Sequence, residues 1–355
     1  MPDQPDHLAP PDRPTPTPDD VRALPLATRL ACVEDVYVVY PRWADIGAEI
    51  AHCHALRRLV GQPAEPACLM LVGPTGVGKS TLVASYTRAY PPVAVIDACG
   101  ERTLRPVVRA TIPTPATVKS LAVALLIALG DPRPTSGTVV TLTDRLTRYL
   151  TDCQVELLVL DELQHFVDRN SRRVLEDASN WLKLLLKTTR VSCVLVGLQD
   201  EAELLLRANP QLARLFGDPY ALDPFAWDDA APETIGEFRR VLAEIERLLP
   251  LAEPSHLAAR DTARRLFVAS GGSMGLLMAL LRRAAHLALA QGREHLDEEL
   301  LAAAYAYRLA GRRRGVPNPF ASASAPDDDR AHVADGANQR GHARGPARDM
   351  WRDVV

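Results

Sequence analysis

Hydrophobic and polar positions follow two alternating periods through the central part of the chain. Short apolar runs, rich in Val and Leu, occur at 67–72, 93–96, 106–112, 156–160 and 191–196. Such runs are typical of strands that are buried on both faces of a sheet. Amphipathic stretches with helical spacing separate most of them, at 79–90, 117–129, 142–150 and 172–187. This alternation predicts an α/β fold with a mostly parallel central sheet. One of the two runs at 93–96 and 106–112 would be an edge strand or a loop.

The two flanks differ from this central region. Residues 1–25 hold eight of the 29 prolines, which predicts a disordered tail in which Thr17 and Pro18 could start a short helix. A helical pattern at 41–60 leads us to assign 26–65 to an N-terminal helical segment. After Trp227, helical patterns follow at 231–249, 255–269, 274–291 and 296–310. We therefore assign 66–228 to an α/β domain, 229–310 to a helical domain and 311–355 to a basic, then disordered, tail.

Composition narrows the class of protein. The chain has 355 residues and a formal net charge of -3. Apolar runs fall short of the roughly 18 residues that cross a bilayer, and the polar N-terminus does not resemble a signal peptide. Six cysteines without a CxxC pair favour reduced thiols. We expect a cytoplasmic protein without membrane contact, and we expect no metal site at 52–54, where His, Cys and His would point in different directions on a helix.

Charge adds little evidence for nucleic-acid binding. Of the 41 basic residues only four are lysines, so the abundance of arginine reflects a general bias in composition. With a pI near 6.3, contact with nucleic acid would need a local basic patch.

One glycine-rich segment matches the phosphate-binding pattern GxxxxGK[ST]. It follows the first predicted strand and begins a helix, as the motif requires. Glycines let backbone N–H groups converge on phosphate oxygens, and the helix N-terminus adds partial positive charge. Lys79 would reach the β- and γ-phosphates of ATP, and Ser80 would coordinate Mg²⁺. The predicted nucleotide-binding residues are Gly73, Pro74, Thr75, Gly76, Val77, Gly78, Lys79, Ser80 and Thr81.

Two acids follow the predicted strand at 156–160. Open α/β sheets bind ligands at the C-terminal ends of their strands, so Asp161 and Glu162 would lie at the edge that carries the glycine-rich loop. Asp161 would hold Mg²⁺ through water, and Glu162 would polarise the attacking water. Phosphoryl transfer depends mainly on positioning and charge stabilisation, so loss of either carboxylate should impair turnover more than folding.

Two further roles in hydrolysis have candidates. A polar residue at the end of the strand at 191–196 could sense the γ-phosphate; Gln199 is the first candidate and Ser192 the second. The alternative for Gln199 is a side chain that faces solvent. An arginine finger from a neighbouring subunit could neutralise charge in the transition state. Arg214 is the candidate, and a surface salt bridge is the alternative.

Several blocks, in order, resemble the TniB/TnsC family of AAA+ transposition ATPases, which are relatives of the phage Mu B protein. They are GPTGVGKST at 73–81, LDELQHFVDR at 160–169, NWLK at 180–183, VLVGLQD at 194–200, NPQLARLFGDPYALDPFAW at 209–227 and NPF at 318–320. The first block alone indicates a P-loop ATPase, and the second and fifth together narrow the family. The resemblance implies a P-loop AAA+ fold with a parallel central sheet and a small C-terminal helical lid domain.

The same resemblance implies an ATP-dependent regulator of DNA transposition. It would bind double-stranded DNA without sequence specificity and form rings or helical filaments. Its partners would be a DDE transposase and a TniQ-like target-selection protein. Lys79, Ser80, Asp161, Glu162 and Arg214 match the family's functional positions. Gln164 and His165 would follow the acids on one loop, with helix capping or packing as the alternative.

Two blocks depart from the family pattern. Relatives often have two arginines before the Phe of the fifth block, whereas Leu215 takes the second place here. If the finger is the second arginine, Arg214 is not the finger. A sensor arginine would lie near 271–275, but the nearest candidates are Arg282 and Arg283, which we expect on the solvated face of a helix.

DNA-backbone contact requires basic and small polar side chains along a phosphate track. In the family, the pore-facing elements follow the second strand and the loop after the acids, which nominates Thr117, Lys119, Arg172 and Arg173. Surface solvation is the alternative for Lys119. The arginine run at 312–314 is a further candidate for contact with DNA or a partner.

Two other functions remain open at this point. One is a signalling P-loop switch that acts through protein contacts, although the tails are short and polar for an attached sensor domain. The other is a DNA-loading or secretion-associated ATPase. A gel-shift assay with and without ATP separates the three.

Overall fold

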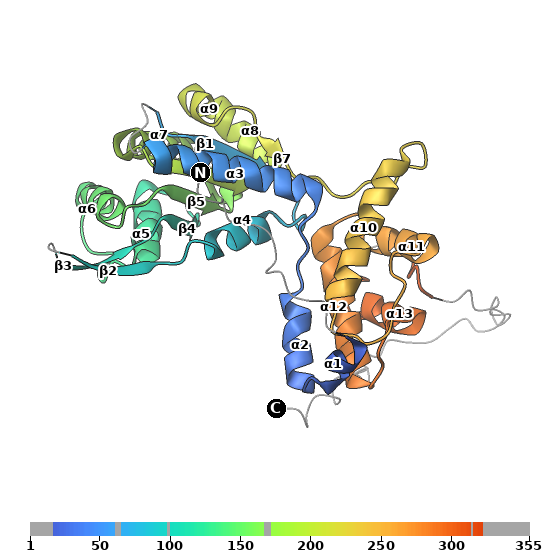
Figure 1. Cartoon of the computed structure of the whole chain (residues 1–355). Coiled ribbons are helices and arrows are strands. Elements are labelled where there is room, and N and C mark those ends of the chain that lie inside the picture. Colours follow the sequence, from blue (N-terminus) through green and yellow to red (C-terminus); the bar gives the residue numbers. More distant parts are fainter. Residues whose placement is uncertain (1–16, 61–64, 98–99, 167–171, 314, 322–355) are drawn as a thin grey trace, which may run out of the picture. The chain divides into compact units, whose positions relative to one another are not determined.

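A parallel sheet of five strands organises the first part of the chain (Figure 1). The strands are β1 (Cys68–Val72), β4 (Val107–Thr111), β5 (Leu157–Asp161), β6 (Ser192–Gly197) and β7 (Tyr220–Ala221). Their order across the sheet is β4-β5-β6-β1-β7, and every neighbouring pair is parallel. The predicted parallel sheet is therefore confirmed, with β4 as the expected edge strand.

The computed structural model describes residues 17–60, 65–97, 100–166, 172–313 and 315–321. All elements belong to one unit, Met1–Phe320, and nearly all of the second unit, Ala321–Val355, lies outside the described residues. The predicted tails at 1–16 and 322–355 therefore remain predictions.

The apolar run at 93–96 does not join the parallel sheet. Strand β2 (Val93–Asp97) pairs antiparallel with β3 (Gly100–Leu104) in a separate hairpin. Ile96 is 82% exposed, so its side chain is not part of a core. The sequence did not indicate β3, because its residues GERTL lack an apolar pattern.

Successive residues of each strand face two different layers of helices, which explains the unbroken apolar runs. Leu69, Leu71 and Val159 join the core cluster on the face covered by α3 (Pro41–Val60) and α4 (Lys79–Arg88). Met70, Val72 and Leu158 join the core on the opposite face. That face is covered by α5 (Val118–Leu129), α6 (Val139–Asp152), α7 (Arg172–Thr189), α8 (Gln199–Ala208) and α9 (Pro210–Phe216).

The chain after Trp227 is helical, as predicted. It forms α10 (Pro232–Leu248), α11 (Arg260–Ser270), α12 (Met274–Ala290) and α13 (Glu298–Arg308). The core cluster of the α3 and α4 face continues through Leu222 and Phe225 into these helices without interruption. At the expected boundary between 228 and 229, the architecture therefore changes from α/β to helical, while one apolar core continues across it.

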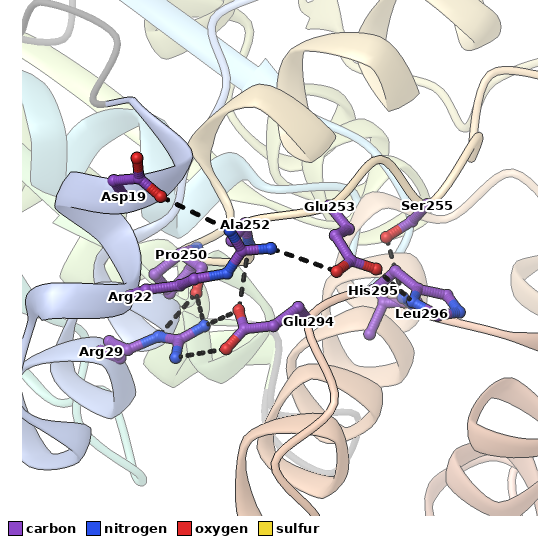
Figure 2. A network of polar contacts seen from close by, with 10 residues as sticks. All are labelled: Asp19, Arg22, Arg29, Pro250, Ala252, Glu253, Ser255, Glu294, His295 and Leu296. Carbon is purple, nitrogen blue, oxygen red and sulfur yellow. Dashed lines mark hydrogen bonds and ion pairs between the residues drawn. The ribbon is translucent and has the colours of Figure 1, made fainter.

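Two short helices precede α3. The N-terminal α1 (Pro18–Ala23) starts at a capping box formed by Thr17 and Asp20, which confirms the short helix expected at Thr17 and Pro18, and α2 (Leu26–Asp35) follows. From α2, Arg29 donates to the Pro250 carbonyl through Nε (3.0 Å) and Nη2 (2.9 Å) and binds the Glu294 carboxylate (Figure 2). These polar contacts attach α2 to the loops around the helical region.

Among the described residues, no single helix is both long and apolar enough to cross a bilayer. The bent pair α11 and α12, with 114° between the helices, meets the length and composition test only when both are taken together.

Candidate nucleotide-binding site

The glycine-rich loop connects β1 to α4, and its backbone requires glycine at several positions. A Cβ atom at Gly73 would lie 2.1 Å from the Leu222 carbonyl oxygen. Gly76 and Gly78 have φ values of +86° and +106°, a region that residues with a side chain rarely occupy. Gly78 is also the N-cap of α4, so backbone N–H groups at this helix start have no side-chain cap. The local sequence therefore builds an N-terminus that is suited to anions.

Lys79 is buried inside this loop. Its Nζ donates to the carbonyls of Gly73 (2.7 Å) and Pro74 (2.9 Å). Burial lowers the pKa of the ammonium group, and the negative charges of Asp161 and Glu162 oppose that shift. The lysine thus lies within electrostatic reach of both acids. Neutral carbonyls are weaker partners for an ammonium group than phosphate oxygens, so the residue is poised to exchange them.

Asp161 ends β5 and is only 3% exposed. Its Oδ1 accepts a hydrogen bond from the Glu162 backbone N–H (2.9 Å), and its Oδ2 accepts one from Arg109 Nη2 (2.7 Å). Sequence analysis missed Arg109, because it lies within a run that was treated as apolar. The available signal was a single charged residue inside a strand that is otherwise suited to burial.

Glu162 adopts φ +67°, which is unusual for a residue with a side chain. Such conformations concentrate at functional sites, where the surrounding structure maintains them. The side-chain amide of Gln164 donates to the Glu162 carboxylate. Gln164 and His165 both lie in the 3-10 helix η1 (Leu163–Phe166), and His165 Nδ1 donates to the Ile112 carbonyl (2.7 Å). Gln164 therefore orients the acid, and His165 attaches its loop to the end of β4.

The start of α12 lies directly against the glycine-rich loop. The Gly76 carbonyl accepts hydrogen bonds from Ser273 Oγ (3.1 Å) and from the Gly275 backbone N–H (2.6 Å). A Cβ atom at Gly275 would lie 2.6 Å from that same carbonyl oxygen. The helical region thus contacts the candidate phosphate site through one side-chain hydroxyl and one backbone N–H.

A cavity of about 350 Å³ opens beside the loop. Ser80 and Thr81 at the start of α4 line it, together with the segment after α2 and Arg282 of α12. Arg282 Nη2 donates to the Val36 carbonyl (2.8 Å). The guanidinium of Arg283 lies 4.3 Å from the centre of the Tyr307 ring. The expectation that both arginines are solvated is wrong: they are half-buried and engaged.

The other hydrolysis candidates lie in different places. Gln199 is exposed at the first position of α8 and donates to Glu203 (3.1 Å). Ser192 lies at the opposite end of β6, where its hydroxyl donates to the Cys53 carbonyl (2.9 Å). The structure does not bring Ser192 to the site. Arg214 is exposed on α9.

The DNA-contact candidates surround two helix starts. Thr117 is the N-cap of α5 and shares a capping box with Ser120, while Lys119 is exposed on its first turn. Arg173 is exposed, with Nε 4.0 Å from Asp177. Arg172 begins α7, and its side chain lies outside the described part of the chain.

Two further sequence candidates have other partners. Arg312 is exposed, Arg313 donates to the Val268 carbonyl (3.0 Å), and Arg314 lies outside the described residues. At 52–54, both ring nitrogens of His54 are engaged, with Tyr86 (2.9 Å) and Glu156 (2.7 Å). In the described residues, no group of three or more His, Cys, Asp or Glu side chains could hold a metal ion.

The residues present fit a magnesium nucleotide. The glycine-rich loop offers backbone N–H groups at a helix start, and Lys79 lies beside them with carbonyl partners only. Ser80 and Asp161 supply a hydroxyl and a buried carboxylate, the oxygen ligands that Mg²⁺ takes beside a phosphate.

Comparisons with known proteins agree with this arrangement. The model of the family described as "Bacterial TniB protein" matches residues 33–226. No curated protein matches the sequence.

Solved structures share the fold at low sequence identity. The Aeropyrum pernix ORC2 protein, solved as ADPNP-ADP complexes, has a TM-score of 0.56 and 20% identity, over 78% of this chain and 71% of that chain. Cdc6p from Pyrobaculum aerophilum has a TM-score of 0.57 and 18% identity, over 81% of this chain and 74% of that chain. The Aeropyrum pernix ORC1 protein in complex with DNA has a TM-score of 0.52 and 18% identity, over 78% and 68% of the two chains. The chain therefore shares the fold of these Orc and Cdc6 proteins.

Proposed function

Because the chain belongs to the TniB family of bacterial proteins, we propose that it is an AAA+ ATPase that regulates DNA transposition. In this proposal it binds ATP and Mg²⁺, assembles on double-stranded DNA without sequence specificity, and recruits or activates a DDE transposase. A TniQ-like protein selects the target. Hydrolysis controls assembly and disassembly.

The ATPase proposal rests on the proximity of Lys79 to Asp161 and Glu162 at one edge of the sheet. Lys79 comes from the β1–α4 connection, and Asp161 and Glu162 come from the end of β5; because β1 and β5 both run parallel to β6, their C-terminal ends lie at the same edge of the sheet. Three residues from distant sequence positions therefore share one edge of the sheet. Parallel sheets bind ligands at this edge.

Each residue has a distinct role in the proposed reaction. The loop N–H groups and Lys79 bind and orient the phosphates, while Ser80 and Asp161 would hold Mg²⁺, which neutralises charge on the phosphates. Glu162, oriented by Gln164, polarises the attacking water and accepts its proton. Arg214 is exposed and thus accessible to the site of a neighbouring subunit, which would make turnover depend on assembly.

The proposal for DNA and partners rests on family membership and on exposed basic residues. Lys119 and Arg173 are both exposed, and they carry the positive charge that a phosphate track requires. The transposase, the target-selection partner and the filament or ring come from the family resemblance, and the cytoplasmic location comes from the composition of the chain.

One experiment tests the central function. The wild type and Glu162→Gln are incubated with duplex DNAs of unrelated sequence, with and without Mg-ATP, and followed by gel shift, phosphate release and electron microscopy. Glu233→Gln, at an exposed position of α10, is the matched control. We expect ATP-dependent binding to all DNAs, turnover in the wild type and the control, and stable DNA-bound arrays of Glu162→Gln.

The outcomes separate the alternatives. ATP hydrolysis without any DNA binding or assembly would favour a signalling switch and overturn the DNA role. DNA-bound arrays that neither bind nor stimulate a DDE transposase would leave a DNA-loading ATPase and overturn the transposition role.

A further inference from the structure

We propose that Arg109 is a built-in competitor of Mg²⁺: its guanidinium occupies Asp161 before nucleotide binds and must leave that carboxylate when the metal arrives. This inference rests on the proposed function, because it assigns Asp161 to Mg²⁺. In this inference Arg109 is a positioning residue that sets the Mg²⁺ concentration required for nucleotide binding.

Strand register places Arg109 where it can compete. Arg109 pairs with Val159, two residues before Asp161 on the neighbouring strand. Val107 and Val159 both belong to the core cluster on the α3 and α4 face. Side chains alternate along a strand, so Arg109 and Asp161 also point to that face. Helix α4, which begins with Lys79, covers the same face.

The contacts of Asp161 leave neither oxygen without a hydrogen-bond donor. Oδ1 accepts the Glu162 N–H at 2.9 Å, and Oδ2 accepts Arg109 Nη2 at 2.7 Å. The Asp161 side chain is 5% exposed, whereas that of Arg109 is 31% exposed. The carboxylate is therefore confined, while the arginine side chain has solvent on one side and room to withdraw.

Electrostatic repulsion prevents the Arg109 guanidinium and Mg²⁺ from occupying the Asp161 carboxylate at the same time. A buried carboxylate is stabilised by one positive partner at hydrogen-bond distance, and a second cation that approaches the same carboxylate through a water ligand meets the repulsion of the first. Mg²⁺ also demands near-octahedral geometry and keeps several waters, which need space beside the carboxylate. The guanidinium must therefore move before Asp161 can serve the metal.

The test measures metal requirement without turnover. Binding of a fluorescent ADP (N-methylanthraniloyl-ADP) is titrated with Mg²⁺ for the wild type, Arg109→Gln and Arg109→Lys. We expect Arg109→Gln to reach half-saturation at about ten-fold lower Mg²⁺. Arg109→Lys retains a positive charge and should stay near the wild type. Thermal unfolding with Mg²⁺ alone is a second readout, in which Mg²⁺ should raise the melting temperature of Arg109→Gln more than that of the wild type.

Arg145→Gln is the matched control. Arg145 Nε lies 2.8 Å from Asp131 Oδ2, and the two side chains are 30% and 3% exposed, so this ion pair matches the Arg109–Asp161 pair in distance and burial, although these two atoms do not form a hydrogen bond. Its Mg²⁺ requirement should equal that of the wild type.

The outcomes distinguish the inference from the function on which it rests. Normal ADP binding with the same Mg²⁺ requirement in Arg109→Gln would overturn the inference alone. Absence of nucleotide binding in the wild type would overturn the proposed function and the inference with it. If Arg109→Gln does not fold, a crystal structure of the wild type with Mg-ADP decides: an intact Arg109–Asp161 contact would overturn the inference.

Discussion

The two adjacent acids contribute differently to the folded chain. Asp161 is buried and accepts hydrogen bonds from Arg109 and the Glu162 backbone, whereas Glu162 is half-buried and bonds Gln164. Loss of a buried charge leaves its partner unsatisfied, while loss of a half-exposed charge does not. The expectation that removal of either acid spares folding thus applies better to Glu162.

This difference gives the first prediction. Asp161→Ala should lower the free energy of unfolding by about 1–3 kcal/mol, and Glu162→Gln by less than about 0.5 kcal/mol. Both should reduce turnover by about 100-fold or more. Urea denaturation monitored by circular dichroism and a phosphate-release assay measure the two quantities. Equal destabilisation by the two substitutions would contradict the structural roles assigned to these acids.

At the scale of single elements, two residues at the start of α5 have different roles: Thr117 caps the helix, and Lys119 is exposed to solvent. The Thr117 side chain accepts the Ser120 N–H as an N-cap, and the Ser120 hydroxyl bonds back to Thr117. Lys119 is exposed on the same turn. Thr117 is therefore committed to the helix end, and Lys119 is available to a phosphate.

The second prediction follows from this division. Thr117→Ala should cost about 1 kcal/mol of stability through the lost cap. Lys119→Ala should leave stability within about 0.5 kcal/mol of the wild type and reduce the salt dependence of DNA binding by about one unit of slope. Chemical denaturation and gel shifts over a range of salt concentrations test both. An unchanged salt slope in Lys119→Ala would remove this residue from the DNA-contact candidates.

Most elements could be predicted from the sequence, because the spacing of their apolar residues matches the positions that are buried in the structure. The runs that became β1, β5 and β6 are almost entirely apolar because helices cover both faces of the sheet, and β4 keeps this pattern except at Arg109 and Thr111. Strand β3 could not be predicted, because its polar residues pair only with β2. Strand β7 has two residues, which are too few to produce a periodic pattern of apolar positions.

The glycine-rich loop and the two acids could be recognised because the chemistry demands those residues at that spacing. Arg109 could not, since its role depends on the register between β4 and β5. The positive φ of Glu162 and the contact of Gly275 with Gly76 also arise only in three dimensions. Arg282 and Arg283 were misjudged because helical periodicity does not show that α2 packs against α12 and that Tyr307 covers Arg283.

At the scale of the whole molecule, the N-terminal helices depend on one buried cation. Arg29 is 8% exposed and binds two partners on the helical region, the Pro250 carbonyl and the Glu294 carboxylate (Figure 2). The hydrogen bonds from Arg29 lower the pKa of Glu294 below its ordinary value of 4.5. The interaction therefore contributes stability to the folded state when Glu294 is ionised.

Removal of this cation is the third prediction. Arg29→Ala should lower the free energy of unfolding at neutral pH by about 2–4 kcal/mol, because it removes the donor to the Pro250 carbonyl and leaves the Glu294 carboxylate with the Ala252 N–H but without its cation. Arg22→Ala is the control, since Arg22 makes an exposed contact with Glu253 at 3.2 Å that is worth about 1 kcal/mol or less. Urea denaturation measures both. Similar losses of unfolding free energy in the two variants would contradict the conclusion that Arg29 contributes more stability than an exposed ion pair.

The fourth prediction concerns pH. A carboxyl group with a lowered folded-state pKa binds fewer protons in the folded state than in the unfolded state. Its stabilising contribution is therefore complete above the ordinary pKa of 4.5 and is lost as pH falls through the lowered value. Glu294→Gln should be less stable than the wild type at neutral pH, and the difference should shrink as pH falls through the lowered pKa of Glu294. A difference that grows on acidification would contradict this sign.

The continuous core that joins the sheet to α10–α13 yields a fifth prediction. Because Leu222 and Phe225 belong to the same apolar cluster as both regions, the two should unfold together. Calorimetry of the protein without nucleotide should show one transition, with equal calorimetric and van't Hoff enthalpies. Two resolved transitions would show that the change of architecture at 228 is an energetic boundary.

The pair of hydrogen bonds to the Gly76 carbonyl has a consequence for protein engineering. Since Ser273 and Gly275 both donate to one carbonyl of the glycine-rich loop, the two segments are a matched set although 199 positions separate the two glycines. A chimera that took its helical region from another protein would need a glycine at 275 and a hydroxyl at 273. Without both, the transplanted helix would collide with the loop or leave its carbonyl unsatisfied, even if every residue of the phosphate-binding motif were intact.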